Sequence, residues 1–345
     1  HDATITAVAF APDGKTALSG SNNGIVHLWD IATGREIQRY IGDDTQVTAV
    51  AFAPDGRTFV FSSHKSMLAL CDVRSEDKVR QFEGHKSGEL RLSINCVSFS
   101  PDGQTLLSGG NDSTVRLWDV NTSAELRRFQ GQHGVVTTVA FAPNGKTMIC
   151  ASYSLAFPEN RTMKLWDVTT GLELQRFEGH SDYITSVAFS PDGLTALSAS
   201  ADLTLRLWDV TTGLELQCFE GHSDHVTSIA FSPDGFTAIS ASRDGTLRLW
   251  QIEDKANSRS LEKSHAQVLS IGFSPDGGSV VSGSADSMVR LWDVTTGLEV
   301  HSCERHNLPV NTVTFTRDGK SILSGSSDTT IRLWNVATGT EMRCF

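Results

Sequence analysis

The chain has 345 residues, 39% of them apolar and 20% charged, a composition typical of a folded rather than a disordered protein. Its net charge of −11 argues against nucleic-acid binding, which requires lysine and arginine gathered on one face. No apolar run approaches the roughly 18 residues of a membrane helix, and the N-terminus lacks a basic region followed by an apolar stretch. We therefore expect partners other than nucleic acids and membranes.

Six cysteines are scattered along the chain, without the Cys-x-x-Cys spacing or the nearby histidine of a metal site. In a chain of this size they are better interpreted as buried thiols, which favours a reducing compartment and a cytoplasmic location. The sequence therefore predicts no disulfide framework, no metal and no cofactor.

A repeat of 42 residues dominates the sequence. Tryptophan marks it, almost always in the string Leu-Trp followed by Asp, Asn or Gln, and the last five copies are 42 residues apart. Cys71 lies 42 residues after Trp29 and occupies the tryptophan place of a further unit. The chain therefore contains eight units and is a repeat protein rather than a chain of two or three ordinary domains. The tryptophans are Trp29, Trp118, Trp166, Trp208, Trp250, Trp292 and Trp334.

Each unit contains four short β-type segments, and turn residues separate them. The first turn reads Ser-Pro-Asp-Gly at Ser190–Gly193, where proline fixes one φ and glycine supplies a positive one. Seven of the nine prolines lie in this turn, and Asp202-Leu203 and Thr212-Gly213 mark the second and third turns. No ten-residue stretch has helical periodicity, so the pattern predicts small sheets stacked around an axis. In the fifth unit the predicted strands are Ile184–Phe189, Thr195–Ser200, Thr204–Val210 and Glu215–Glu220.

These motifs resemble those of the WD40-repeat family along all 345 residues. Gly-His, Ser-Pro-Asp-Gly, Ser-Ala-Ser-x-Asp and Leu-Trp-Asp occur in register. The resemblance implies an all-β, eight-bladed β-propeller of four-stranded antiparallel blades, forming a single domain over residues 1–345. The near-identical units are similar to those of bacterial members, and we expect this domain to be a piece of a longer protein. The predicted blades begin near His1, Asp43, His85, Gln132, His180, His222, Ser264 and His306.

The limits of the repeat also predict how the ring closes. The chain starts just before an innermost strand and stops within an outermost one, so each blade consists of consecutive residues. The strand exchange that usually locks such rings is then absent, and closure rests on blade 1 packing against blade 8.

Histidine, serine and aspartate recur in each regular unit, a set that could suggest a catalytic triad. The family resemblance implies instead a buried hydrogen-bond chain from Trp to Ser to His to Asp. A catalyst needs one site with an oxyanion hole, whereas four interchangeable copies favour a structural role, so we predict that the protein is not an enzyme. The four sets are His85, Ser108, Asp112, Trp118; His180, Ser198, Asp202, Trp208; His222, Ser240, Asp244, Trp250; and His306, Ser324, Asp328, Trp334.

Four units depart from this set. Blade 2 has lost all four groups, and we expect Asp43 and Lys65 to pair ionically in their place. Each lost network costs on the order of 1–3 kcal/mol, which predicts that blade 2 is the least stable part of the ring. The replacements are Asn23 in blade 1; Asp43, Phe61, Lys65 and Cys71 in blade 2; Gln132, Cys150 and Asn160 in blade 4; and Ser264, followed by His265, in blade 7.

Two insertions indicate where a partner binds. Five extra residues lie within Lys86–Asn95, in a blade-to-blade loop, and six within Tyr153–Glu159, in a second turn. The resemblance places both on the face where this family most often holds ligands. They carry apolar side chains that a solvated loop does not need, so we hypothesise a protein-binding patch over blades 2–4; the alternative is neutral drift, since loop insertions cost little. These side chains are Leu90, Leu92, Leu155 and Phe157.

Blades 5 and 6 give a second indication. Aligning residues 166–207 with 208–249 gives 34 identities in 42 positions. Three of the eight differences fall on the inferred ligand face: Tyr183/His225, Ala201/Arg243 and Leu203/Gly245. We therefore add Tyr183, His225 and Arg243 to the candidate contacts, because tyrosine and arginine are good interface anchors. Free drift of exposed positions is the alternative.

The arginines of the Arg-Leu-Trp strings recur blade by blade. We expect their stems to line the packing between blades and their guanidinium groups to meet local carboxylates, which leaves no support for nucleic-acid binding. They are Arg116, Arg206, Arg248, Arg290 and Arg332.

The function we predict is a monomeric, non-catalytic interaction module that binds a protein or peptide. A runner-up is a ligand- or peptide-sensing regulatory domain of a larger protein with a kinase, nucleotide-hydrolase or protease-like effector. An enzyme comes third, with His225 and Arg243 as its only local candidates.

Overall fold

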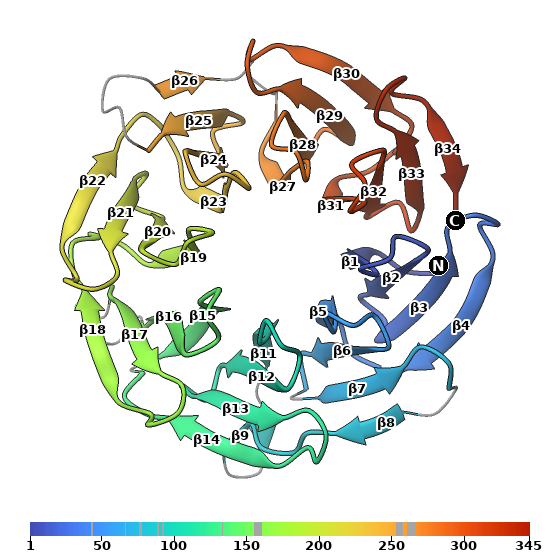
Figure 1. The fold of residues 1–345 in the computed structure, drawn as a ribbon. Coiled ribbons are helices and arrows are strands. Elements are labelled where there is room, and N and C mark those ends of the chain that lie inside the picture. The colour runs from blue at the N-terminus through green and yellow to red at the C-terminus, as the bar shows by residue number, and fades with distance from the viewer. Residues whose placement is uncertain are drawn as a thin grey trace.

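Each 42-residue unit folds into one antiparallel sheet, and the sheets stand around a central axis (Figure 1). The computed structural model describes residues 1–42, 44–65, 67–75, 78–87, 90–91, 93–132, 134–154, 161–252, 258–260 and 266–345. In this part of the chain every regular element is a β-strand, and eight sheets have four strands each. We call these sheets blades 1 to 8 in chain order.

The strands of the first four blades have the following bounds. Blade 1 contains β1 (Ile5–Phe10), β2 (Thr16–Ser21), β3 (Ile25–Asp30) and β4 (Glu36–Ile41), and blade 2 contains β5 (Val47–Phe52), β6 (Thr58–Ser63), β7 (Leu68–Asp72) and β8 (Lys78–Gln81). Blade 3 contains β11 (Ile94–Phe99), β12 (Thr105–Gly110), β13 (Val115–Asp119) and β14 (Glu125–Phe129), and blade 4 contains β15 (Val135–Phe141), β16 (Thr147–Tyr153), β17 (Met163–Asp167) and β18 (Glu173–Phe177).

The second half of the ring repeats this arrangement. Blade 5 contains β19 (Ile184–Phe189), β20 (Thr195–Ser200), β21 (Leu205–Asp209) and β22 (Glu215–Phe219), and blade 6 contains β23 (Val226–Phe231), β24 (Thr237–Ser242), β25 (Leu247–Gln251) and β26 (Ser258–Ser260). Blade 7 contains β27 (Val268–Phe273), β28 (Ser279–Ser284), β29 (Met288–Asp293) and β30 (Glu299–Glu304), and blade 8 contains β31 (Val310–Phe315), β32 (Ser321–Ser326), β33 (Ile331–Asn335) and β34 (Glu341–Cys344). In blade 5 the third and fourth strands are shorter than predicted, and the backbone N–H of Val210, just after β21, donates to the Leu194 carbonyl.

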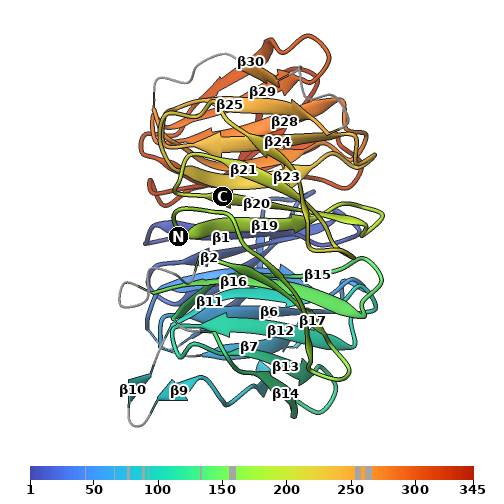
Figure 2. The same ribbon diagram turned by 90° about the vertical axis from the view of Figure 1, so that its left-hand side faces the viewer.

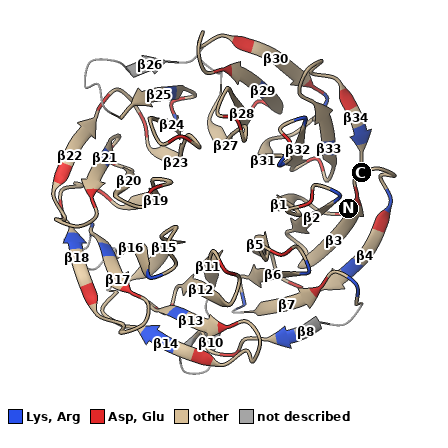
Figure 3. Ribbon diagram, in the orientation of Figure 1, with Lys and Arg blue, Asp and Glu red and all other residues tan. Residues whose placement is uncertain are grey.

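Within a blade the strands follow chain order from the axis to the rim (Figure 1). One short hairpin, formed by β9 (Lys86–Ser87) and β10 (Leu90–Arg91), stands outside the blades near β13 and β14 (Figures 1 and 2). The innermost strands carry no charged residue, and charges gather on the outer strands and in turns (Figure 3). No helix that could cross a membrane is found among the described residues.

The ring closes by packing between its first and last blades. Every blade is built from consecutive residues, so no strand is exchanged at the seam. Ile5, Ala17 and Trp29 of blade 1 share one core cluster with Leu323, Ile331 and Leu333 of blade 8. The side-chain amide of Asn311 also donates to the Ile5 carbonyl at 2.7 Å. The closure predicted from the limits of the repeat is therefore present.

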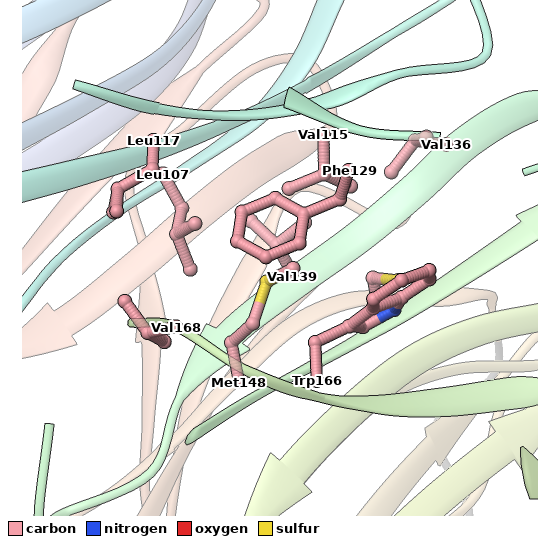
Figure 4. Close-up of a cluster of buried hydrophobic side chains, with 10 residues drawn as sticks. Leu107, Val115, Leu117, Phe129, Val136, Val139, Met148, Trp166 and Val168 are labelled. Atoms are coloured by element: carbon pink, nitrogen blue, oxygen red, sulfur yellow. The ribbon is translucent and has the colours of Figure 1, made fainter. Parts of the chain in front are cut away.

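The apolar core lies between blades rather than within them. In Figure 4, Leu107, Leu117 and Phe129 of blade 3 face Met148 and Trp166 of blade 4. The second strand of each blade is buried along nearly its whole length, because blades cover both of its faces. Each blade thus buries its apolar surface on two neighbours, which makes the ring a stack of nearest-neighbour contacts.

A belt of hydrogen bonds also links the innermost strands. The hydroxyl of Thr185 donates to the Val226 carbonyl of the next blade at 2.7 Å. In blade 7 the equivalent residue is Leu269, whose side chain cannot donate a hydrogen bond. The equivalent donors are Thr6, Thr48, Asn95, Thr137, Thr227 and Asn311.

Candidate functional site

The histidine, serine, aspartate and tryptophan of the regular blades lie together. In blade 5, His180 Nδ1 is 2.8 Å from Asp202 Oδ2 and His180 Nε2 is 2.7 Å from Ser198 Oγ. The Trp208 indole N–H donates to the same Oγ at 2.8 Å. The four residues come from the blade-to-blade loop, second strand, second turn and third strand. The other three sets have the same contacts, at 2.6–3.0 Å: His85, Ser108, Asp112, Trp118; His222, Ser240, Asp244, Trp250; and His306, Ser324, Asp328, Trp334.

The hydrogen-bond directions assign one tautomer to each of these histidines. The carboxylate accepts, so Nδ1 carries the proton, and Nε2 then accepts from the serine hydroxyl. The serine oxygen is buried and already accepts from the indole N–H. A nucleophile must be exposed to substrate, and this oxygen is not. The arrangement joins three strands and a loop.

The network also controls the acidity of its carboxylates. Burial raises the pKa of Asp112, but hydrogen bonds from His85, Thr114 and Arg116 outweigh it and lower the pKa to about 2. Burial is likewise outweighed at Asp244 and Asp328, whose pKa values fall to about 2. For His222 and His306 burial dominates and lowers the pKa, although the paired aspartates oppose it. Neutral His222 and His306, next to ionised Asp244 and Asp328, are therefore the stable state.

Blade 4 shows what the replacements do. The side-chain amide of Gln132 donates to Cys150 Sγ at 3.1 Å, in the places of histidine and serine. Burial raises the pKa of the Cys150 thiol to about 12. Sulfur is a weak acceptor, and the Trp166 indole N–H has no hydrogen-bond partner among the described residues. Asn160 lies outside the described residues.

The other irregular blades keep parts of the network. In blade 1, His1 Nε2 and the Trp29 indole N–H both contact Ser19 Oγ, at 2.5 and 2.8 Å. Asn23, in the aspartate place, accepts from Ser21 Oγ. In blade 7 the Trp292 indole N–H donates to Ser282 Oγ at 2.9 Å. Ser264 and His265 lie outside the described residues.

Blade 2 replaces the network by apolar packing. Phe61 and Cys71 are fully buried in one core cluster with Phe59 and Tyr40. Lys65 is exposed. Asp43 lies outside the described residues, and with it the expected Asp43–Lys65 pair.

Cations of the third strands meet carboxylates of the fourth. Arg116 Nη1 lies 2.6 Å from Glu125 Oε2 and Arg206 Nη1 lies 2.5 Å from Glu215 Oε2. Arg332 pairs with Glu341 in the same way. These arginines fill the space beside the Gly-His loop, where a methyl group on Gly179 would lie 2.5 Å from Arg206 Nη1. Arg116 is buried, Arg206 and Arg332 are half-buried, and all three are paired rather than gathered in a basic stripe.

One end of the inner strands carries two rows of residues that differ from blade to blade. We call this end, formed by the blade-to-blade loops and second turns, the loop face. A first-row residue precedes the innermost strand, and a second-row residue follows the second strand and bonds to it through the backbone. Ala201 N donates to Tyr183 O at 3.0 Å, and Arg243 N donates to His225 O at 2.9 Å. The rows surround the central axis of the ring, since these strands are innermost (Figure 1).

Three aromatic side chains form an arc across the loop face of blades 4, 5 and 6. The ring centroids of Tyr153 and Tyr183 are 5.1 Å apart, and those of Tyr183 and His225 are 5.9 Å apart. A hydrogen bond of 3.3 Å joins Tyr183 Oη and His225 Nδ1. All three are half-buried, and Arg243 beside them is exposed. Tyr183, His225 and Arg243 are thus together, whereas Ala201 is buried.

Tyr153 was missed as a contact by sequence reasoning. Strand pairing of Val136 with Ser152 corresponds to that of Ile184 with Ser200, which makes Tyr153 the counterpart of Ala201. The signal was present, because Tyr153 begins the insertion of blade 4. The predicted contacts Leu92, Leu155 and Phe157, and the side chain of Leu90, lie outside the described residues.

No metal or disulfide chemistry is built into the described part of the chain. No group of three or more histidine, cysteine, aspartate or glutamate side chains there could hold a metal ion. All six cysteines are described, and none is in a disulfide.

Eight four-stranded blades, each fastened by buried tryptophan and its partners, define an eight-bladed β-propeller. The chain belongs to the WD40 family, because the family model "WD domain, G-beta repeat" matches it in eight segments that together cover most of its length. The matched segments are residues 1–30, 34–70, 76–119, 123–167, 171–209, 213–251, 257–293 and 297–335. Propellers of this family generally serve as scaffolds for protein interactions.

A solved structure supports the same fold. The crystal structure of the computationally designed Ika8 protein is 29% identical in sequence, with a TM-score of 0.84 and 97% of each chain covered. No match is found among curated proteins.

Proposed function

We propose that this protein is a non-catalytic interaction module that binds a partner protein or peptide on its loop face, from the blade 3 and 4 insertions to Arg243. The observation that carries the proposal is the arc of Tyr153, Tyr183 and His225, three half-buried aromatic rings in contact across three blades. Blades 5 and 6 are otherwise near-identical, and three of their eight differences fall on this face.

The arc has the properties of an interface anchor. Aromatic and arginine side chains contribute most of the energy at protein interfaces. The bond between Tyr183 and His225 fixes both rings before a partner arrives, which lowers the entropy cost of binding. Exposed Arg243 supplies a cation at the end of the arc, suited to a carboxylate of the partner.

The same contacts argue against the enzymatic alternative. His225 and Arg243 were its only candidates, and the His225 ring is engaged by Tyr183. The serines that hydrogen-bond to histidine, as the nucleophile of a catalytic triad does, are buried in the structural networks. We further propose that the module is monomeric and cytoplasmic, consistent with cysteines that form no disulfides.

A capture experiment with matched variants tests the proposal. The variant combines Tyr183→Ala, His225→Ala and Arg243→Glu. The control changes equivalent places in blades 8 and 1, through Ser327→Glu and Thr4→Ala. We expect proteins captured from lysate of the source cells to be lost with the variant and kept with the control, at equal melting temperatures.

Cross-linking adds direct evidence of contact. A photoreactive amino acid at position 183 should cross-link the captured protein, and one at position 4 should not. Equal capture by all three proteins, with no cross-link at position 183, would rule out Tyr183, His225 and Arg243 as the binding site.

A further inference from the structure

The first turns of the blades pack on one another around the face opposite to the loop face, which we call the turn face. In seven of the eight turns a proline stands second, and its ring lies against the glycine of the next blade's turn. A methyl group built on Gly235 would be 3.2 Å from Pro191 Cδ, so the ring and the glycine are in close contact. The contact pairs are Pro12 with Gly56, Pro54 with Gly103, Pro101 with Gly145, Pro143 with Gly193, Pro191 with Gly235, Pro233 with Gly277, and Pro275 with Gly319.

The eighth contact is missing at the seam between blades 8 and 1. Arg317 stands in the proline place, and a methyl group built on Gly14 would meet no atom within 4 Å. An open cleft of about 450 Å³ occupies the gap. This volume is within the range of about 300–1,000 Å³ that is usual for ligand sites. Its lining residues are Pro12, Asp13, Gly14, Ile31, Thr316, Arg317, Asp318 and Ser321.

The cleft continues toward the innermost strands β1, β27 and β31. A second hollow of about 360 Å³ shares Pro12, Thr316 and Arg317 with it. Apolar side chains, including Phe10, Phe273 and Phe315, line this second hollow. Because the two hollows share these three residues, we treat them as one groove.

The lining of the groove carries two carboxylates, Asp13 and Asp318, and one cation, Arg317. Asp13 and Asp318 already accept the backbone amides of Lys15 and Lys320, at 2.9 and 3.1 Å. Arg317 is exposed, and no ion pair is found for it within the described residues. A guanidinium without a carboxylate partner favours an acidic group on the ligand.

We propose that this cleft, at the seam between blades 8 and 1, binds a proline-containing acidic peptide segment of a partner protein. The proline ring of the ligand lies against Gly14. It takes the place that a proline of the chain occupies between each of the other seven pairs of neighbouring blades. A ligand carboxylate next to that proline pairs with Arg317. Proline-rich segments are extended before binding and lose little entropy on docking. This site is separate from the loop face and does not depend on the function proposed there.

The experiment uses synthetic peptides and calorimetry. The probes are acetylated, amidated tetrapeptides with adjacent proline and glutamate in both orders, and the same peptides with alanine in place of proline. We expect one site on the native protein with a Kd of about 1 mM or tighter, and at least about tenfold weaker binding of the alanine peptides. Arg317→Pro, which rebuilds the eighth proline–glycine contact, should abolish binding and raise the melting temperature.

A matched variant opens the same gap elsewhere. Pro191→Arg leaves Gly235 uncovered, beside Asp192, Asp234 and Ile252, the counterparts of the seam lining. It should raise the stoichiometry from one peptide to two. Arg317→Ala, which keeps the gap without the cation, should retain the preference for proline over alanine. It should lose the preference that the native protein has for these peptides over further probes with glutamine in place of glutamate. No binding by the native protein, or equal binding by the native protein and Arg317→Pro, would overturn the proposal.

Discussion

Blades 4 and 5 are neighbours with the same strand order, but only one has a complete hydrogen-bond network. In blade 5 the Trp208 N–H reaches Ser198, which bonds to His180. In blade 4 sulfur replaces the serine oxygen, and the Trp166 N–H has no partner among the described residues. Trp166 is nevertheless buried in the apolar cluster of Figure 4. Packing between blades therefore builds the blade, and the network adds stability to it.

The two blades also differ in what their second turns present. Blade 5 keeps a short turn, with buried Ala201 at the loop face. Blade 4 places Tyr153 there, in contact with Tyr183. The blade with the weaker network thus supplies an aromatic contact to the candidate partner site. Blades 4 and 5 share the packing that holds the ring, and they differ at positions that leave it intact.

Acidification is expected to have the largest effect, because it acts on all complete networks at once. For His222 and His306 the folded pKa lies below 6.5, so their contribution is complete above that pH and falls as the pH decreases. For Asp112, Asp244 and Asp328 the folded pKa is about 2 against 3.8 when unfolded. Their contribution, about 2 kcal/mol each, is present above pH 3.8 and is lost as the pH falls through 2.

The measurement is the melting temperature by circular dichroism from pH 7.5 to pH 2. We expect a gradual fall below pH 6.5 and a steep one below pH 4. His222→Gln, which copies Gln132 of blade 4, should reduce the fall between pH 6.5 and pH 5. A melting temperature that stays constant down to pH 3 contradicts this assignment of charges.

Ser198→Ala is expected to have the next largest effect. It leaves the Trp208 N–H and His180 Nε2 buried without a partner, at a cost of about 3 kcal/mol. Cys150→Ala, at the same place in blade 4, should cost about 1 kcal/mol, because Trp166 makes no bond there to lose. Urea denaturation followed by tryptophan fluorescence measures both. Equal losses would mean that the networks of blades 4 and 5 are equivalent.

The repeat made most of the fold predictable. Proline and glycine fix the first turn locally, and the 42-residue spacing of tryptophan carries the same strand order around the ring. The partners of His180 followed from the family resemblance. The closure of the ring followed from where the repeat starts and stops.

The remaining features depend on contacts between blades, which no single repeat contains. An insertion hides that Tyr153 is the counterpart of Arg243, and only strand register reveals it. Arg317 is visible in the sequence as a break in the proline pattern. Its consequence at Gly14 requires knowing that each proline packs on the glycine of the next blade.

Cys150→Ser is a smaller change that makes blade 4 more like blade 5. It gives the Trp166 N–H an oxygen acceptor at the position of Ser198 while Gln132 can still donate to it. We expect a gain of about 1 kcal/mol in the free energy of unfolding. The midpoint of urea denaturation measures it, with Cys96→Ser as a control for removing a thiol outside the network. A loss of stability would show that Gln132 requires the sulfur.

The smallest expected effect comes from comparing blade 5 with its other neighbour, blade 6. Leu203 has a φ of +75°, and Gly245, its counterpart in blade 6, has a φ of +76°. A leucine side chain is strained in this left-handed region, whereas glycine is not. Leu203→Gly should therefore gain about 0.5 kcal/mol, after the greater chain entropy of glycine in the unfolded state has offset part of the relief. Gly245→Leu should lose a similar amount.

The two substitutions are reciprocal and can be combined in a double variant. The measurement is the free energy of unfolding of both single variants and of the double variant. The double variant should match the native protein, because it exchanges one turn sequence between two near-identical blades. If Leu203→Gly instead destabilises the protein, Leu203 makes contacts that outweigh its backbone strain. Leu203 is half-buried, and strain that persists there without such contacts is expected where a turn serves binding rather than stability. Leu203→Gly should then weaken partner capture without lowering the melting temperature, which would extend the binding site from the aromatic arc into the second turn of blade 5.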